Sequence, residues 1–270
     1  MTTPDVIRLP EGRRPVLVVS HERSGTHFLI NALAACFDYV SKPWVSIDQH
    51  RFNINFYSAD NLHRLISGLA EARLANTLKS HHEFAFFSKF IASLEHAIDI
   101  VYIFRNPADV MASYWRYLHT WPWAEGPEVD SVYQFANTSP MGALMRLQFR
   151  QYDTMLDRWA NHVQHWLDAH HLANLHIVRY ETLNQHYGDT IRGLAQALRI
   201  SLRQIVRPSR HESVVPGGKL SFTPSPNADD REAVTALALS KYPELMASLG
   251  YAPNCPPAAF VPPVSRPLHV

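Results

Sequence analysis

One segment near the N-terminus constrains the fold more than any other. Val16–Ser20 is a short, continuous apolar run rich in valine, which is typical of a strand buried on both faces of a parallel sheet. After a break at His21–Gly25, the apolar residues of Thr26–Phe37 recur with helical periodicity. The sequence therefore predicts a strand, a tight loop and a helix, the repeating unit of an α/β fold.

The same alternation continues along the chain. Further strands are expected at Leu74–Ser80, Ile98–Phe104 and Leu175–Arg179. Helices are expected near Ala59–Ala72, over Ala108–Leu118, within Met141–Ala169 as one long helix or two joined ones, and over Asp189–Leu198 and Asp230–Leu249. Trp121–Ser139 and residues 208–230 have the composition of loops.

This pattern predicts a single α/β domain over residues 15–251, with a central, mostly parallel sheet flanked by helices. Residues 1–14 are expected to form a loose lead-in. Residues 252–270 are expected to form a proline-rich tail.

Composition narrows the classes of function. The net charge of +1 provides no global basic field for nucleic acid, so an anionic ligand has to be held by local geometry. Cys36 and Cys255 lie far apart, which disfavours a disulfide framework and fits a reduced, cytoplasmic compartment. No apolar run is long enough to span a bilayer, and no signal peptide is recognised. The 16 histidines form no motif with metal-ligand spacing, so no metal is expected.

The loop before the first helix has the residue types of a phosphate site. A helix N-terminus presents free N–H groups and the positive end of a dipole. Gly25 allows close approach of the backbone, Ser24 and Thr26 add hydroxyl groups, and Arg23 adds a fixed charge. Taken alone, the loop supports a phosphate site and an ordinary capped turn about equally.

The loop departs from that of nucleoside triphosphatases. Ser20 replaces the first glycine, and Thr26 stands where the lysine is required. The strongest later strand ends in Arg105 and not in a magnesium-binding aspartate. These departures disfavour a kinase-like phosphotransferase, which stays open as an alternative beside a catalytically inactive nucleotide-binding module.

Three further motifs follow predicted strands: Lys79-Ser80-His81, Arg105-Asn106-Pro107-Ala108-Asp109-Val110 with Ser113 eight residues after Arg105, and Tyr180-Glu181. Together with Arg23-Ser24-Gly25-Thr26, this order resembles the sulfotransferases that use 3′-phosphoadenosine 5′-phosphosulfate (PAPS). The resemblance covers roughly Val16 to Tyr251 and includes the stretch Trp159–Trp166. It implies a nucleotide-kinase-like α/β fold with a P-loop-like first loop. The implied reaction is transfer of a sulfuryl group to a hydroxyl, without a metal, giving adenosine 3′,5′-bisphosphate (PAP).

The resemblance also implies which residues hold the nucleotide. Arg23 would bind the 5′-phosphate and the bridging oxygen, and Ser24, Gly25, Thr26 and His27 would cradle the same phosphate. His27 replaces a threonine that is common in the family, so its side chain brings an imidazole in place of a hydroxyl.

Further positions match the rest of the nucleotide. Arg105 and Ser113 match the pair that binds the 3′-phosphate, Phe28 stands where many members stack a tryptophan on adenine, and Tyr180 matches a tyrosine near the adenine. The family's late glycine-rich motif is not intact. Gly218 and Lys219, within Pro216–Phe222, are its nearest match, with Arg210 as a stand-in for the missing arginine.

The catalytic roles fall on His81, Lys79 and Arg23. His81 matches the family's general base, and His82 is the alternative. A hydroxyl is a poor nucleophile near neutral pH, and an unperturbed imidazole with a pKa near ~6.5 can accept its proton. Lys79 and Arg23 would neutralise the charge that develops on the leaving group.

The acceptor is expected to be a small-molecule or glycan hydroxyl. Aromatic residues after the Lys79–His81 motif and after Ser113 could line a pocket for an apolar or aromatic alcohol. For most of them, ordinary packing in the core is the alternative interpretation. These residues are Phe84, Phe86, Phe87, Trp115, Tyr117, Trp121 and Trp123. A monomer and a homodimer both stay open.

Overall fold

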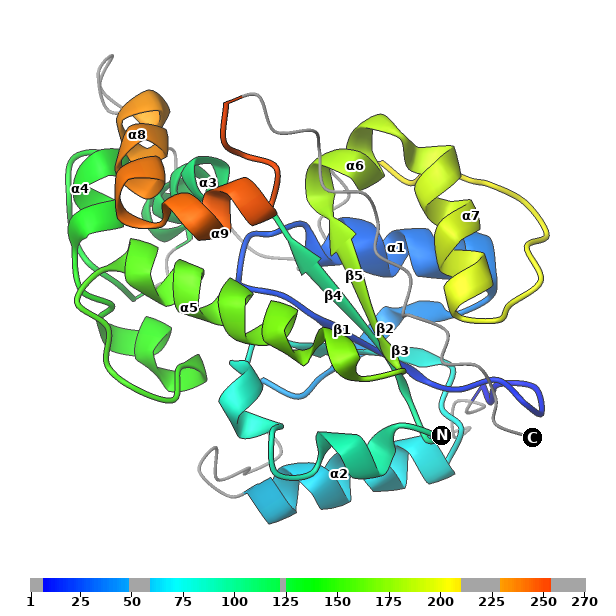
Figure 1. Ribbon diagram of the computed structural model, residues 1–270. Coiled ribbons are helices and arrows are strands. Elements are labelled where there is room, and N and C mark those ends of the chain that lie inside the picture. The colour runs from blue at the N-terminus through cyan, green and yellow to red at the C-terminus, as the bar shows by residue number, and fades with distance from the viewer. Residues whose placement is uncertain (1–6, 49–58, 122–124, 210–228, 254–270) are drawn as a thin grey trace.

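The computed structural model describes residues 7–48, 59–121, 125–209 and 229–253 (Figure 1). Within these residues, five parallel strands form one sheet in the order β2-β3-β1-β4-β5. The strands are β1 (Val16–Val19), β2 (Val40–Ser46), β3 (Asn76–Ser80), β4 (Asp99–Phe104) and β5 (Leu175–Arg179). The predicted α/β class with a parallel central sheet is confirmed.

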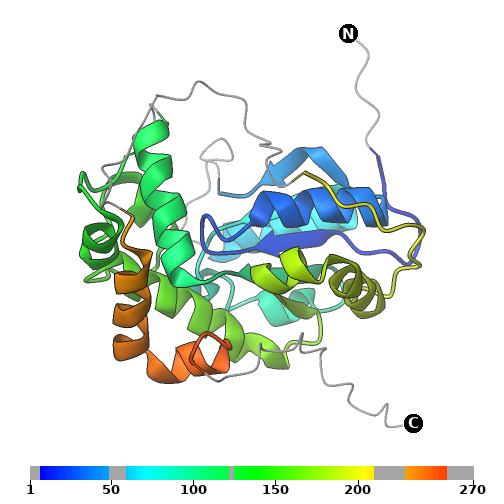
Figure 2. The same ribbon diagram turned by 90° about the horizontal axis from the view of Figure 1, so that it is seen from above.

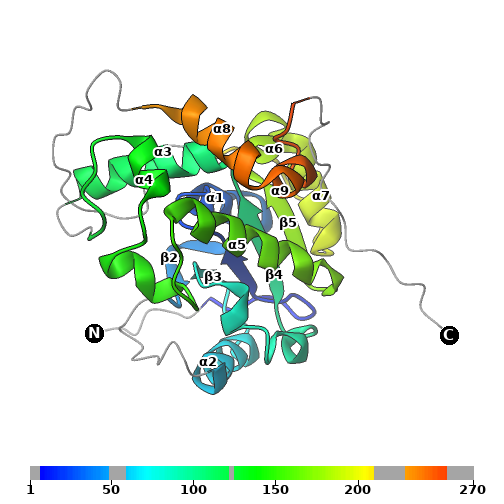
Figure 3. The same cartoon turned by 60° about the vertical axis from the view of Figure 1, so that its left-hand side comes forward.

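Helices lie on both sides of this sheet (Figures 1 and 2). One side carries α1 (Thr26–Phe37), α6 (Tyr180–Gln185) and α7 (Tyr187–Ala197). The other side carries α2 (Ala59–Glu71) and α5 (Met155–Asp168). Beside α5 lie α3 (Pro107–Thr120), α4 (Val132–Asn137), α8 (Arg231–Lys241) and α9 (Pro243–Ser248), grouped together in Figure 3. No helix in the described part of the chain is long and apolar enough to cross a membrane.

The core forms two layers because successive side chains of a strand point to opposite faces. Val16 and Val18 of β1 pack with residues of α1 and α7, whereas Leu17 and Val19 pack with residues of α2, α3 and α5. All four side chains are fully buried. This two-sided burial explains why the first strand is a continuous apolar run and not an alternating one.

The strand order predicts a ligand-binding crevice at the carboxyl ends of the central strands. From β1 the chain passes to β2 and β3 on one side of β1, and then crosses to β4 and β5 on the other side. Ligands of open α/β sheets bind where the connections diverge in this way. The motifs at Ser20–Gly25, Lys79–His81 and Arg105 all stand at or just after the carboxyl ends of β1, β3 and β4.

Strand β2 is absent from the sequence-based prediction. It lies at the edge of the sheet, and Lys42 and Pro43 in its middle are exposed. An edge strand tolerates proline and needs no continuous apolar run, so its sequence lacks the signal that marked the central strands.

One loop prediction and two helical predictions need correction. Trp121–Ser139 is not all loop, because Ser131 caps α4 by accepting a hydrogen bond from the Gln134 N–H over 3.2 Å. Met141–Ala169 is neither one helix nor two joined directly. A 3₁₀ turn, η4 (Gly142–Leu147), is followed by non-helical residues, and α5 begins only after its cap Thr154. Asp230–Leu249 divides into α8 and α9 at Pro243, which has no N–H to continue a helix.

Candidate active site

The first loop turns sharply through left-handed backbone at two residues. Arg23 has φ 67° and Gly25 has φ 97°. A Cβ atom at Gly25 would lie 2.3 Å from Cδ2 of Tyr180, so only glycine fits between this loop and the end of β5. Gly25 then leads directly into α1, whose first-turn N–H groups have no partner within the helix.

A buried ion pair anchors the loop to α5. Arg158 donates to both carboxylate oxygens of Glu22 over 2.8 and 2.9 Å, and Arg158 is fully buried. Burial by itself raises the pKa of Glu22, but the charge of Arg158 outweighs it and holds that pKa well below its usual range. Arg158 also donates to Nε2 of His21 over 2.8 Å, and the Tyr114 hydroxyl donates to Glu22 over 3.3 Å. The loop backbone is therefore fixed before any ligand binds.

His81 has a defined tautomer. Its Nδ1 lies 2.9 Å from the Ser20 carbonyl oxygen, which can only accept, and 3.2 Å from the Ser20 hydroxyl, which can accept as well as donate, so a proton on Nδ1 satisfies both contacts. Nε2 then holds the free lone pair. Burial, followed by the positive charge of Lys79, lowers the pKa of His81 to about 4, so the imidazole is neutral at neutral pH. His162 on α5 donates from Nε2 to the His81 carbonyl over 3.3 Å and braces the backbone at this position.

His82 differs from His81 in accessibility. Only 1% of His82 is exposed, whereas His81 is half-buried. Nδ1 of His82 lies 2.9 Å from the Ser80 hydroxyl, and the His82 carbonyl accepts from the Trp166 indole over 3.3 Å. His82 is therefore part of the packed interior behind the crevice.

Lys79, the residue before the last of β3, forms a buried ion pair. Its ammonium donates to Oδ2 of Asp48 over 2.7 Å, and both side chains are at most one-tenth exposed. Asp48 follows β2, the strand that lies beside β3. The ammonium group has three N–H donors, so two remain for other partners.

A second part of the crevice is a basic pocket of about 270 Å³. Among the residues described, four arginines line it: Arg23, Arg105, Arg116 and Arg231. Arg23 donates from Nε to the Ser113 hydroxyl over 3.2 Å, and its guanidinium lies 4.9 Å from the centre of the Tyr117 ring. The guanidinium of Arg105 stacks 4.6 Å from the centre of the Tyr180 ring.

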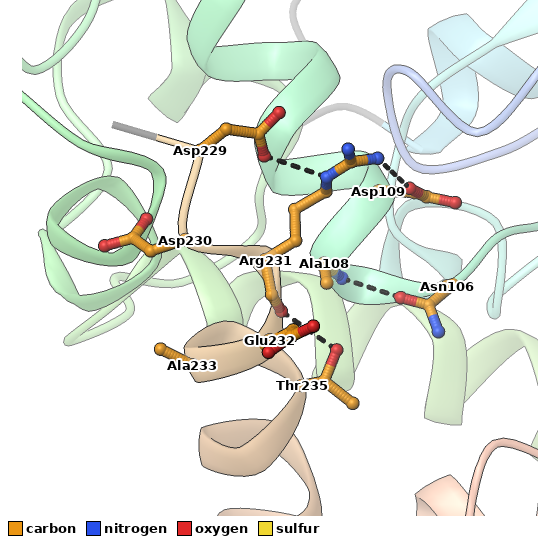
Figure 4. A pocket seen from close by; sticks show the side chains of 9 residues that line it. All are labelled: Asn106, Ala108, Asp109, Asp229, Asp230, Arg231, Glu232, Ala233 and Thr235. Carbon is orange, nitrogen blue, oxygen red and sulfur yellow. Dashed lines mark hydrogen bonds and ion pairs between the residues drawn. The ribbon is translucent and has the colours of Figure 1, made fainter. Parts of the chain in front are cut away.

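Two aspartates pair with three of these arginines. Asp109 pairs with Arg105 over 3.4 Å and with Arg231 over 3.1 Å, and Asp229 pairs with Arg116 and, over 2.8 Å, with Arg231. Figure 4 shows the Arg231 side chain running between the two carboxylates, at the border of a wider opening of about 840 Å³. Four guanidinium groups against two carboxylates leave the basic pocket net positive, which favours an anion.

The start of α3 explains the Arg105-Asn106-Pro107 motif. The Asn106 side chain accepts from the Ala108 N–H over 2.9 Å and caps the helix, and Pro107 occupies the first turn, where its missing N–H costs nothing. The Asn106 N–H donates to Glu181 over 2.9 Å, which ties this turn to α6. Arg105 is thereby held at the rim of the crevice.

The remaining predicted loop residues lie around the same turn. Ser24 is buried and its hydroxyl has no hydrogen-bond partner, whereas the Thr26 hydroxyl lies 2.7 Å from that of Ser20. Burial and the charge of Lys79 lower the pKa of His27 to about 3, so this imidazole is neutral. Phe28 is 5% exposed and packs with Tyr180 and Tyr187 in the α1 layer of the core.

The predicted acceptor walls divide into core and crevice residues. Phe86, Phe87 and Trp115 are buried in the core, as ordinary packing predicts. Tyr117 and Trp121 line the basic pocket. Trp123, Arg210, Gly218 and Lys219 lie outside the described residues.

Several polar residues of the site are absent from the sequence-based prediction, among them Asp48, Arg116 and Arg231. Asp48 follows a strand that carried no strand signal. Arg116 was detectable, because Asp109, Ser113 and Arg116 share one face of α3 at helical spacing. Arg231 enters from α8, 122 residues after its partner Asp109, and no local pattern connects them. In the described part of the chain, no group of three or more His, Cys, Asp or Glu side chains could hold a metal ion.

This chain is similar in sequence and in fold to known sulfotransferases. A family model described as "Sulfotransferase domain" matches residues 13–215. A crystal structure of a sulfotransferase from Alicyclobacillus acidocaldarius shares the fold, with TM-score 0.53 and 16% identity over 89% of this chain and 97% of that chain. A mouse sulfotransferase complexed with PAP matches with TM-score 0.47 and 16% identity over 72% of this chain. The chain spans 60% of the mouse enzyme's length. A search of curated protein sequences gives no significant match.

Proposed function

The chain belongs to the sulfotransferase domain family, and from that premise we propose that it moves a sulfuryl group from PAPS to an acceptor hydroxyl. One observation carries the proposal. The loop at Ser20–Gly25, the pair Lys79 and His81, and the arginine pocket lie around the carboxyl ends of β1, β3 and β4. A nucleotide with anionic groups at both ends of its ribose fits this division into two anion-binding parts.

The residues present fit PAPS. The buried Ser24 hydroxyl and the buried Nε of Arg105 have no hydrogen-bond partner, and each offers a donor to an anionic oxygen. Ser24, Gly25, Thr26 and His27 would hold the 5′-phosphate at the start of α1. Arg105 and Ser113 would hold the 3′-phosphate, with Arg116 and Arg231 beside them. PAPS supplies the sulfuryl group, and PAP departs as the leaving group.

His81 is suited to accept the acceptor's proton. Its Nδ1–H is committed to the Ser20 carbonyl, so the free Nε2 lone pair is the atom that would take up the proton as the new O–S bond forms. Its lowered pKa keeps it neutral, and so competent as a base, throughout the neutral range. The hydrogen bond to the Ser20 carbonyl also sets the orientation of the His81 ring. A general base has to keep its orientation from one turnover to the next.

Lys79 and Arg23 would stabilise the charge that grows on the bridging oxygen as the S–O bond breaks. The two N–H donors of Lys79 that Asp48 leaves free are suited to this. Arg23, held on the Ser113 hydroxyl, reaches both anion-binding parts of the crevice, since it belongs to the loop and lines the arginine pocket.

The acceptor class is proposed as a small-molecule or glycan hydroxyl. Tyr117 and Trp121 are the aromatic residues that line the crevice itself. The cytoplasmic location, the limits of the domain at 15 and 251, and the choice between monomer and homodimer stay predictions from the sequence.

A thermal-shift titration with PAP, run beside Mg·ATP, tests the proposal. A ligand at about 100 times its Kd stabilises a fold by about 2.7 kcal/mol, which raises the melting temperature of a chain of this size by several degrees. We expect this shift with PAP in the presence of EDTA and none with Mg·ATP. A shift with Mg·ATP alone would favour the phosphotransferase alternative. PAP binding without any release of PAP from PAPS, across a panel of hydroxyl acceptors, would favour an inactive nucleotide-binding module.

A further inference from the structure

Asp48 contacts the whole Lys79–His82 segment through one carboxylate. Oδ2 accepts from the Lys79 ammonium over 2.7 Å. Oδ1 accepts from the His81 backbone N–H over 2.7 Å and from the Ser80 hydroxyl over 3.3 Å, and it lies 3.3 Å from Nδ1 of His82. Asp48 is 7% exposed, so these contacts replace its hydration.

The two carboxylate oxygens of Asp48 contact the two residues that the proposed reaction uses, Lys79 and His81. One holds the Lys79 side chain, and the other holds the backbone that carries the His81 imidazole. A lysine ammonium sits on a flexible four-carbon stem and has no position of its own without such a partner. The buried pair also keeps the ionised form of Asp48. Burial alone raises its pKa, but the charge of Lys79 and the hydrogen bond from His82 hold it well below the usual range.

We propose that Asp48 is a positioning residue for sulfuryl transfer, which sets the Lys79 ammonium and the His81 backbone relative to each other without touching the reacting atoms. This inference rests on the proposed function. A misplacement of about 1 Å in a catalytic group can lower a rate by about 10²-fold, so loss of the Asp48 charge is expected to act mainly on turnover.

Nucleotide binding gives a readout that a merely structural role would not produce. Asp48 is an anion beside the crevice that would receive an anionic nucleotide, so removing its charge takes away a repulsion. Loss of a residue needed only for folding would weaken PAP binding. Loss of a positioning anion leaves PAP affinity unchanged or raises it, while kcat falls.

The pH profile gives a second readout. His81 faces charged or titratable groups from five elements: His21 and Glu22 of the first loop, His27 of α1, Asp48 after β2, Lys79 of β3, and His162 of α5. Of these, Asp48 and Glu22 raise the pKa of His81, and Lys79 lowers it. Without the Asp48 charge, the acid limb of kcat/KM is expected to move to lower pH.

The experiment compares Asp48→Asn with Asp99→Asn in the full chain. The asparagine keeps the shape and an oxygen that accepts from the His81 N–H, and it removes only the charge. Asp99 is the matched control, because it is also 7% exposed and also ion-paired, with Arg14 over 3.4 Å, but it lies at the opposite end of β4. We expect D48N to lower kcat about 10²-fold with a PAP Kd within threefold of wild type or tighter, and D99N to keep wild-type kcat.

The outcomes separate this inference from the proposed function. A wild-type protein that neither binds PAP nor releases it from PAPS overturns the proposed function, and the inference falls with it. An active wild type with an unchanged D48N, or a D48N whose PAP affinity falls in parallel with kcat, overturns only the inference.

A second pair of variants covers the case in which D48N does not fold. Removing both partners of a buried ion pair costs less than removing one. Lys79→Met is therefore compared with the double variant D48N/K79M. Asparagine keeps the oxygen that accepts from the His81 N–H, and at pH 7 His81 is neutral with or without the Asp48 charge. With Lys79 removed, the two variants are therefore expected to have the same kcat at pH 7 within threefold. A further tenfold loss in the double variant overturns the inference.

Discussion

The Tyr180 ring lies so close to Gly25 that a Cβ atom at Gly25 would come within 2.3 Å of its Cδ2 atom. The same ring also contacts Arg105, whose guanidinium stacks 4.6 Å from the ring centre. One tyrosine directly after β5 therefore contacts both the turn at the start of α1 and an arginine of the basic pocket. That Tyr180 contacts the nucleotide stays a prediction from the family resemblance. Its packing against the loop is a feature of the fold.

Gly25→Ala is expected to lower the free energy of unfolding by more than the cost of placing alanine in a left-handed backbone conformation. Gly12→Ala is the matched control, because Gly12 also has a positive φ, of 80°, but no atom lies within 4 Å of its added Cβ. The left-handed conformation costs alanine about 1–2 kcal/mol at either position, and overpacking against Tyr180 adds about 1–3 kcal/mol at Gly25. Urea unfolding of both variants measures the difference. Equal losses of stability would show that the Tyr180 ring moves aside freely.

Arg231→Ala is expected to weaken PAP binding about tenfold, because it removes one of the cations lining the basic pocket. The affinity for adenosine 5′-phosphate, which has no 3′-phosphate, should stay within twofold. Arg192→Ala is the control, since Arg192 is paired on the surface of α7 with Asp189 and its side chain is 60% exposed. Calorimetric titration with both nucleotides checks the prediction. Equal weakening for the two nucleotides would place the effect of Arg231 outside 3′-phosphate recognition.

His81→Ala and His82→Ala should separate catalysis from packing. His81→Ala is expected to lower kcat by about 10²–10⁴-fold with PAP affinity preserved, because a general base contributes about that much. His82→Ala is expected to lower the free energy of unfolding, because His82 is buried against Ser80 and Phe86. Steady-state kinetics and thermal melts of both variants test this. Full turnover in His81→Ala, with turnover lost in a stable His82→Ala, would transfer the base role to His82.

Stability is expected to fall as the pH drops from about 6.5 toward 4. Burial and nearby cations lower the pKa of His21 and of His81 to about 4 and that of His27 to about 3. The unfolded chain therefore binds protons in this interval that the folded chain does not, so acid favours unfolding. Glu22 and Asp48, whose pKa values are lowered, begin to add their loss near the lower end of this interval and continue to do so below it. Urea midpoints between pH 8 and 4 measure the slope, and a flat profile from 6.5 to 4.5 would contradict neutral, buried histidines.

Much of the site could be predicted because its motifs are local. Ser20–Gly25 had to follow a buried strand and precede a helix, and the observed α1 spans the predicted Thr26–Phe37. β5 likewise spans the predicted Leu175–Arg179. The boundaries in the α4 and η4 region were wrong because short capped turns, such as the one Ser131 begins, leave too few residues for a periodic signal.

Sequence alone determined the alternation of strands and helices and the order of the polar motifs that follow the strands, because both are expressed in periodicity and in neighbouring residues. Only the tertiary structure decided that Asp48 holds Lys79, that Arg231 joins Arg105 through Asp109, and that Tyr180 requires a glycine at position 25. It also decided the tautomer of His81 through the Ser20 carbonyl. The physical reason is that each of these depends on the distance between groups far apart in the chain, and strand order and helix packing set that distance.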